Sequence, residues 1–259
     1  MADDRTLIQI RERSFLDLLD LALVVVRSRP RSLGLAALAG VAPCAALNAW
    51  LTADPEFPFL YYLGLLAVEA PWATAPLTVV LGGMMFGERP SAGRVVRTLV
   101  RGLPAMFIYQ FVVRGVLTSF VLTFPVVVGK LAFLNEVILL ERGKSLGAMK
   151  RCTLLTSDRG GDFMGRWLAQ FCFGLAFIAC FWFGTGLAFN SLTTSELTWN
   201  EPGWGDLYGV RSQFAVWLTI SFFGVARFLT YIDQRIRLEG WEVKVRLQAV
   251  GRSLEEASR

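Results

Sequence analysis

The chain has 259 residues, 54% of them hydrophobic, including 20 Phe and 8 Trp, and its mean hydropathy is +0.49. This hydrophobic fraction and mean hydropathy are higher than those of an ordinary soluble domain of this length. They favour a protein whose apolar surface is surrounded by the lipid bilayer. The net charge of +5 does not indicate nucleic-acid binding, because the basic residues are spread over short segments between apolar runs. A soluble protein and a nucleic-acid-binding protein are therefore excluded first.

Residues suited to catalysis or metal binding are scarce. The chain has no histidine, which removes the commonest metal ligand and general base. Its cysteines form no CxxC pair, and most of them lie in apolar runs, as small buried hydrophobic residues do. They are Cys44, Cys152, Cys172 and Cys180. Since no serine or cysteine stands with a base, and no carboxylates have metal-ligand spacing, we expect neither an enzyme nor a cofactor.

Residues 14–27 form the first expected element, an amphipathic helix. Asp17, Asp20 and Arg27 share one narrow face of it, and apolar residues cover the remainder. The helix is too short and too charged to cross a bilayer. Two placements are open: the helix lies in the cytoplasmic interface, or its apolar side packs on the other helices. In both cases residues 1–31 form a cytoplasmic N-terminal segment.

Six apolar runs follow, and a helix needs about 20 residues to cross about 30 Å of hydrocarbon. The expected spans cover about 32–51, 59–86, 103–123, 125–141, 163–189 and 211–231. A charged helical tail, 232–259, ends the chain. The sequence thus predicts an all-α polytopic integral membrane protein, with a domain of six transmembrane helices at 32–231, an N-terminal interfacial amphipathic helix and a charged helical C-terminal tail.

The positions of Lys and Arg predict the orientation of these spans. All of the 26 basic residues except Arg114, Lys130 and Arg211 lie in the segments 1–31, 87–102, 141–166 and 227–259. The segments 52–58 and 190–210 contain none. Because cytoplasmic loops carry the excess of basic residues, we expect both termini in the cytoplasm and the chain in the cell (inner) membrane.

Four charged residues fall at the predicted membrane depth: Glu69, Arg114, Lys130 and Glu136. Each such charge costs about 2.5 to 3.5 kcal/mol on insertion scales, so it usually faces protein or water. Acids and bases could pair as structural links, for example Glu69 with Arg114, or the residues could line a substrate or proton path. Lys130 or Glu136 could also reach an interface. A proline two residues after Glu69 frees a backbone carbonyl, which makes 66–71 the most plausible polar pocket.

Basic residues near the cytoplasmic side could bind anionic lipid headgroups, at about 1 kcal/mol per charge. The candidates are Lys144, Lys150, Arg151, Arg235 and Arg237. The general excess of Lys and Arg in cytoplasmic loops explains the same residues without any specific lipid binding. The expected partners are therefore the lipid bilayer, anionic lipids and proteins at the cytoplasmic face, and no nucleic acid.

Three stretches carry a family resemblance: NEVILLERGKSLGAMKRCTLLTSDRGGDFMGRWL, RFLTYIDQRIRLEGWEVKVRLQ and GERPSAGRVVRTLVRG. They resemble the bacterial glycerophosphoryl diester phosphodiesterase membrane-domain family and related uncharacterised six-span membrane proteins. The resemblance implies the membrane part alone. The chain has no room for the phosphodiesterase barrel of the fused members and no histidine for its acid/base pair. Phosphodiesterase activity is therefore not implied.

The functional hypothesis is a non-enzymatic membrane scaffold or accessory subunit that contacts partners through its basic cytoplasmic face. It is motivated by the absence of a reactive cluster together with cytoplasmic helices. The alternative is a small transporter or lipid-handling protein, with Glu69, Arg114 and Glu136 along the path. A membrane-bound enzyme is a third hypothesis.

Overall fold

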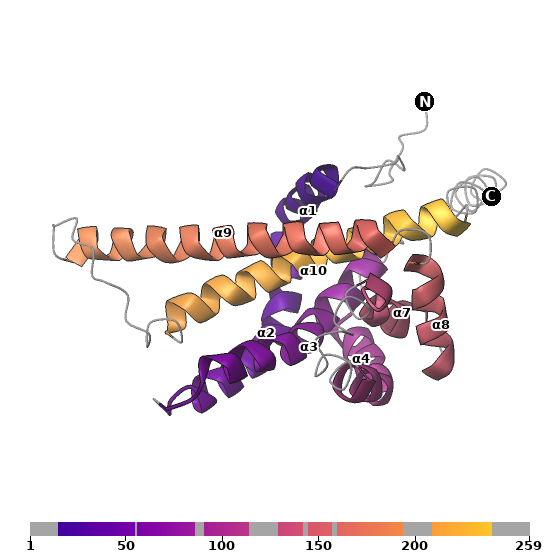
Figure 1. Cartoon of the computed structure of the whole chain (residues 1–259), viewed down its shortest axis with the longest axis horizontal. Coiled ribbons are helices and arrows are strands. Elements are labelled where there is room, and N and C mark those ends of the chain that lie inside the picture. The colour runs from indigo at the N-terminus through magenta and orange to yellow at the C-terminus, as the bar shows by residue number, and fades with distance from the viewer. Residues whose placement is uncertain are drawn as a thin grey trace.

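The computed structural model describes residues 15–54, 56–85, 91–113, 129–141, 145–156, 160–193 and 209–239. Every regular element in these ranges is a helix (Figure 1). The helices are α1 (Phe15–Ser28), α2 (Pro30–Leu51), α3 (Phe59–Met85), α4 (Ala92–Met106), the π-helix η1 (Phe107–Val113), α7 (Leu134–Leu140), α8 (Ser145–Thr156), α9 (Gly160–Thr193) and α10 (Val210–Glu239). The all-α prediction is confirmed for this part of the chain.

Five helices are long and apolar enough to cross a membrane, as judged by length and composition. They are Pro30–Leu51, Phe59–Met85, Ala92–Val112, Met164–Ala188 and Val210–Leu238. They correspond to the first, second, third, fifth and sixth predicted spans. The predicted fourth span, 125–141, begins outside the described residues. Its described part, 129–141, contains the seven-residue α7, with a short turn before it at 131–133. Five candidate spans are therefore shown, and the sixth stays a prediction.

Two helix boundaries differ from the predicted ones. The third apolar helix begins at Ala92, well before residue 103, because Arg94, Arg97 and Arg101 recur at helical spacing and share one face of α4. The last helix continues to Glu239, so the first residues of the expected charged tail belong to α10.

A π-helix replaces the α-helix in the second half of this third span. Pro104 has no N–H to donate, and beyond it the backbone N–H of Phe107 contacts the carbonyls of both Leu103 and Pro104. The widened turn then runs from Phe107 to Val113. It buries Tyr109.

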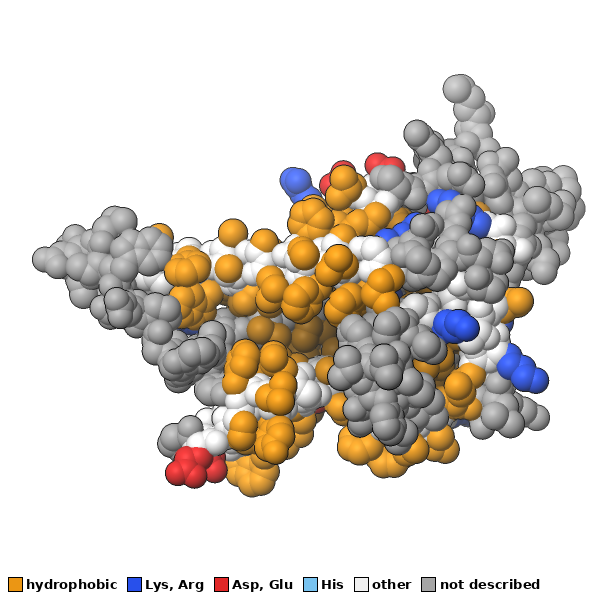
Figure 2. Space-filling model, in the orientation of Figure 1, with side chains coloured by type: hydrophobic (Ala, Val, Ile, Leu, Met, Phe, Trp, Pro, Cys, Tyr) orange, Lys and Arg blue, Asp and Glu red, His pale blue; other side chains and the backbone are white. Residues whose placement is uncertain are grey.

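Helices α3 and α10 form the centre of the molecule. α3 packs against α2, α4 and α7, and α10 packs against α1, α3 and α9. In the apolar stretches of both central helices 61% of the residues are buried, compared with 6% in that of α9. Figure 1 shows α9 (orange) running along α10 at one side of the molecule, and Figure 2 shows hydrophobic side chains exposed along it. α9 is thus a peripheral helix.

One stripe of α1 packs on the other helices. Leu18 and Ala22 are fully buried within the main core, and the helix lies against α10. Leu16, Leu23 and Val24 stay exposed on its other apolar side. The prediction that the apolar side of this helix packs on the other helices therefore holds for one stripe of residues. A second apolar stripe is exposed and could lie in a membrane interface.

Helices α2 and α3 approach each other very closely at one glycine. A Cβ atom at Gly40 would overlap the backbone carbonyl oxygen of Ala73, whereas one at Gly34 would meet nothing within 4 Å. Only glycine fits at Gly40, and the two backbones are therefore in direct contact there.

Candidate functional site

The middle of α3 carries polar groups that contact three other helices. Three hydrogen bonds make these contacts, and their donors are Asn48 of α2, Asn135 of α7 and Arg227 of α10. We call the set the polar centre, and its members are Asn48, Glu69, Pro71, Thr74, Asn135, Glu136 and Arg227. The predicted polar segment 66–71 overlaps this set.

Glu69 is held by an amide from α2. Asn48 donates from Nδ2 to the Glu69 Oε2 atom over 2.8 Å. Asn48 is 0% exposed and Glu69 is 6% exposed. Cys44 lies one turn before Asn48 and is near enough to interact electrostatically with the Glu69 carboxylate. Glu69 stands roughly 15 Å along α3 from Phe59, inside the candidate span Phe59–Met85.

Glu136 has a different partner, an arginine of α10. The Nε of Arg227 donates to Glu136 Oε1 over 2.7 Å, and Glu136 is 0% exposed. The same guanidinium donates from Nη2 to the hydroxyl of Thr74, over 3.1 Å. One arginine therefore connects α7, α3 and α10.

Asn135 adds a second bond between α7 and α3. Its Nδ2 donates to the backbone carbonyl of Pro71 over 2.9 Å, and the side chain is buried. Phe133, Leu134 and Val137 are buried on the same short helix. α7 is thus embedded on all sides, which requires its polar side chains to find partners inside the protein.

A second cluster surrounds Glu141, at the end of α7. Arg151 of α8 donates from Nε to Oε2 over 2.8 Å, and the hydroxyl of Tyr231 donates to Oε1 over 2.7 Å. The Nε of Arg235 lies 3.6 Å from Oε1, and its guanidinium sits 5.8 Å from the centre of the Tyr231 ring. Glu141 therefore joins α7 to α8 and α10.

The four charged residues predicted at membrane depth have separate environments. Glu69 and Glu136 are both buried in the polar centre, and each has its own partner. Lys130 is exposed and helical, and a short turn at 131–133 separates it from α7. Arg114 lies outside the described residues, so its pairing with Glu69 stays a prediction.

Most of the described candidate lipid contacts are already paired with acids. Arg151 and Arg235 form salt bridges with Glu141. Arg237 donates from Nε to Asp233, one turn earlier on α10, over 3.0 Å. Lys150 is exposed on α8. Lys144 lies outside the described residues.

Arg227 and Asn48, two residues of the polar centre, are not among the candidates that the sequence analysis names. Arg227 lies within the predicted span 211–231, yet it was counted with the basic C-terminal segment. Asn48 lies inside the predicted span 32–51. Each is a polar side chain within an apolar run, and that signal could have identified both.

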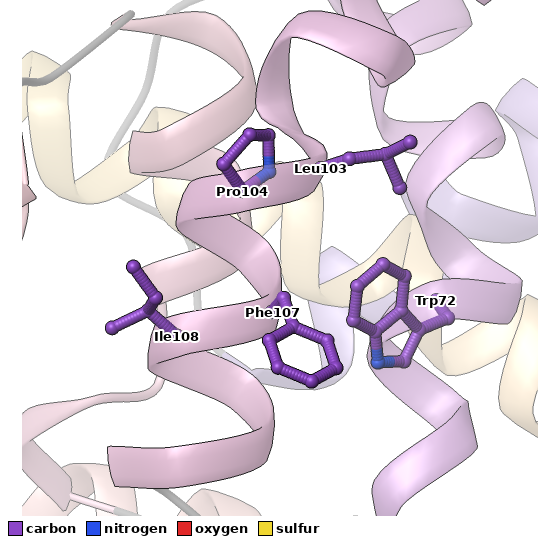
Figure 3. Close-up of a pocket in the computed structure, with 5 residues that line it drawn as sticks. All are labelled: Trp72, Leu103, Pro104, Phe107 and Ile108. Atoms are coloured by element: carbon purple, nitrogen blue, oxygen red, sulfur yellow. The ribbon is translucent and has the colours of Figure 1, made fainter.

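A hollow of about 650 Å³ lies between α3 and the α4/η1 helix. It is lined by Trp72, Leu103, Pro104, Phe107 and Ile108. Figure 3 shows the rings of Trp72 and Phe107 beside each other. The lining is apolar and has no titratable group, so the hollow suits hydrocarbon and offers no acid–base chemistry.

These features describe a helical protein with five helices suited to crossing a membrane and a buried polar centre. No group of three or more Cys, Asp or Glu that could hold a metal ion occurs within the described residues. Comparison with known proteins gave no match: no family model matches the chain, nor does any curated protein or solved structure. The resemblance noted in the sequence therefore stays a prediction.

Proposed function

We propose that the chain is a non-enzymatic integral membrane scaffold or accessory subunit. The observation that carries this proposal is the contrast between its centre and its flank. Helices α3, α7 and α10 are connected by buried polar contacts, whereas α9 packs chiefly on α10 and exposes apolar residues along most of its length. Such a flank is available for side-by-side contact with a transmembrane helix of another protein.

The outer face of α9 has the spacing that helix association needs. Cys172, Ala176 and Cys180 recur every fourth residue and are exposed. Gly184 continues the series and is also exposed. Small residues at this spacing allow two transmembrane helices to approach closely. A transmembrane helix of a partner protein is the occupant that we propose for this face.

The proposed location is the cell (inner) membrane, with both termini in the cytoplasm. Basic side chains support this orientation. In Figure 2 Lys and Arg side chains gather at the end of the molecule where α8 lies, and the loop after α2, at the other end, carries acidic ones. The basic face around α8 is the proposed contact for cytoplasmic partners and anionic lipids.

Thiol crosslinking in native membranes tests the scaffold proposal. Cys172 and Cys180 are exposed on α9, whereas Cys152 is buried and provides the matched control. We expect a short bifunctional maleimide to join the chain to one identified membrane protein through Cys172 or Cys180. Replacing Ala176 by Phe, between the two thiols, should abolish the product and leave thermal stability unchanged. A chain that stays alone, or product formed equally by the Ala176→Phe variant, would contradict the proposal.

A small transporter is the second candidate, and Glu69 is the observation that favours it. This buried carboxylate has an amide partner and contacts no basic side chain within the described residues. Glu69→Ala separates the two functions. A structural residue would lower thermal stability when removed, whereas a transport residue would abolish flux in reconstituted vesicles and leave the fold intact.

A further inference from the structure

Within the described residues, two oxygen atoms of the Asn48–Glu69 pair have no hydrogen-bond donor. They are Oε1 of Glu69 and Oδ1 of Asn48, and both are buried. Asn48 uses its amide nitrogen to bind the other carboxylate oxygen. A buried polar atom without a partner costs about 1 to 3 kcal/mol, so these two oxygens are able to bind a ligand that needs acceptors. Asn135 Oδ1 and Glu136 Oε2 also lack a donor among the described residues, but there Arg227 already supplies a positive charge.

Charge points to the same kind of ligand. In the described part of the chain no basic group neutralises Glu69, although an isolated carboxylate in an apolar interior is very unfavourable. One positive charge would make the pair neutral. A divalent ion would keep one uncompensated positive charge beside a single carboxylate. An anion would not bind, because both oxygens are hydrogen-bond acceptors.

We propose that Asn48 and Glu69 bind a monovalent metal cation between α2 and α3, through Oδ1 and Oε1. Carboxylate and amide oxygens are the ligands that hard cations prefer.

The close contact of α2 and α3 fits this assignment. Gly40 brings α2 against the backbone of Ala73, one turn beyond Glu69 on α3. The two ligand side chains come from the two helices of this contact, so a bound cation would link them. The cation site is independent of the scaffold proposal, which concerns α9.

Thermal unfolding of the purified full chain in detergent tests the site. Sodium chloride is titrated against N-methyl-D-glucamine chloride at constant ionic strength, and potassium chloride is tested separately. With sodium or potassium at about a hundredfold excess over Kd, we expect the Tm to rise by about 5 °C and to saturate. Glu69→Gln keeps the side-chain shape without the charge, so its Tm should not respond to either cation. In cation-free buffer it should be at least as stable as the wild type.

Glu141→Gln is the matched control, because Glu141 is a carboxylate with its own Arg151 and Tyr231 partners. We expect it to keep the full cation response. An equal Tm in all three salts would overturn the proposal, since water or a proton would then satisfy the oxygens. Lower stability of Glu69→Gln in every salt would also overturn it, since a fixed positive group would then hold Glu69. Neither result would affect crosslinking through α9, so the two proposals fail separately.

Discussion

Glu69 and Glu136 are two carboxylates buried in one polar centre, and the protein accommodates them differently. Glu136 lies 2.7 Å from an arginine that crosses from α10. Glu69 accepts a hydrogen bond from a neutral amide of α2 and contacts no basic side chain in the described ranges. The contact of α7 with α10 at Glu136 therefore depends on an ion pair. The contact of α2 with α3 near Glu69 depends on close backbone packing at Gly40.

This difference separates structural from functional roles. A buried ion pair connects helices permanently, since either member alone would be an uncompensated charge. A carboxylate that meets no basic group in the described part of the chain, as Glu69 does, is suited to exchange a cation. The comparison therefore supports a structural role for Glu136 and the binding role that we propose for Glu69, and variants at each contact test both.

The largest effect is expected from removing the arginine of the ion pair. Arg227→Leu should lower the free energy of unfolding by about 3 kcal/mol, because it leaves the fully buried Glu136 without its counter-charge. Unfolding by SDS in mixed micelles, followed by circular dichroism, measures this change.

The double variant Glu136→Leu/Arg227→Leu is the control for that experiment. It removes both charges, so it should recover much of the lost stability. A double variant that is no more stable than Arg227→Leu would show that the loss came from packing and not from the charge.

A smaller loss is expected at the contact of α2 with α3. Gly40→Ala should lower the free energy of unfolding by about 2 kcal/mol, because the added methyl group meets the Ala73 carbonyl and not a flexible side chain. Gly34→Ala, on the same helix, should be neutral or slightly stabilising, since nothing lies near it. Equal stabilities of the two variants in the same SDS titration would contradict the close approach of the two helices.

Tyr231→Phe should have a smaller effect still, about 1 kcal/mol, because it removes one hydrogen bond to Glu141 and retains the ring. Tyr61→Phe is the matched control, since Tyr61 is exposed on α3 and should tolerate the change. The same SDS titration measures both variants. An unchanged Tyr231→Phe would mean that Arg151 and Arg235 hold Glu141 without help.

The last test is a pH dependence near Glu136, for which the direction of the change is predicted. Burial, and then the negative charges of Glu136 and Glu141, raise the pKa of the Cys152 thiol from 9.0 to about 12. The fold thus favours the neutral thiol, and its contribution to stability is complete below pH 9 and is lost as the pH rises toward 12. Cys152→Ala should remove this component of the alkaline loss, as measured by SDS unfolding at pH 8 and pH 11. A variant that loses as much stability as the wild type would contradict it.

The helices were predictable where long apolar runs recur, since about 20 apolar residues define a crossing from sequence alone. The first, second, fifth and sixth spans begin within a few residues of their predicted starts. Helix starts in basic segments were less accurate. Residues 92–102 form part of the third helix, because amphipathic arginine spacing is compatible with both a helix and a cytoplasmic loop.

The pairing in the polar centre was not predictable. The sequence indicated that Glu69 and Glu136 need partners at depth, yet it could not identify them. Arg227 stands 91 residues from Glu136, and Asn48 stands 21 residues from Glu69. Which face of α10 turns toward α7 depends on the packing of several helices, and no local pattern encodes it.

The length of α9 has a consequence for how the protein sits in a bilayer. Its apolar stretch, Met164–Ala188, has 25 residues and is about 37 Å long, compared with about 30 Å of hydrocarbon. A stretch that exceeds the hydrocarbon thickness inclines from the bilayer normal or thickens the surrounding lipid. Because α9 runs along α10, the two helices would lean together, and the degree of inclination would follow the acyl-chain length of the host membrane.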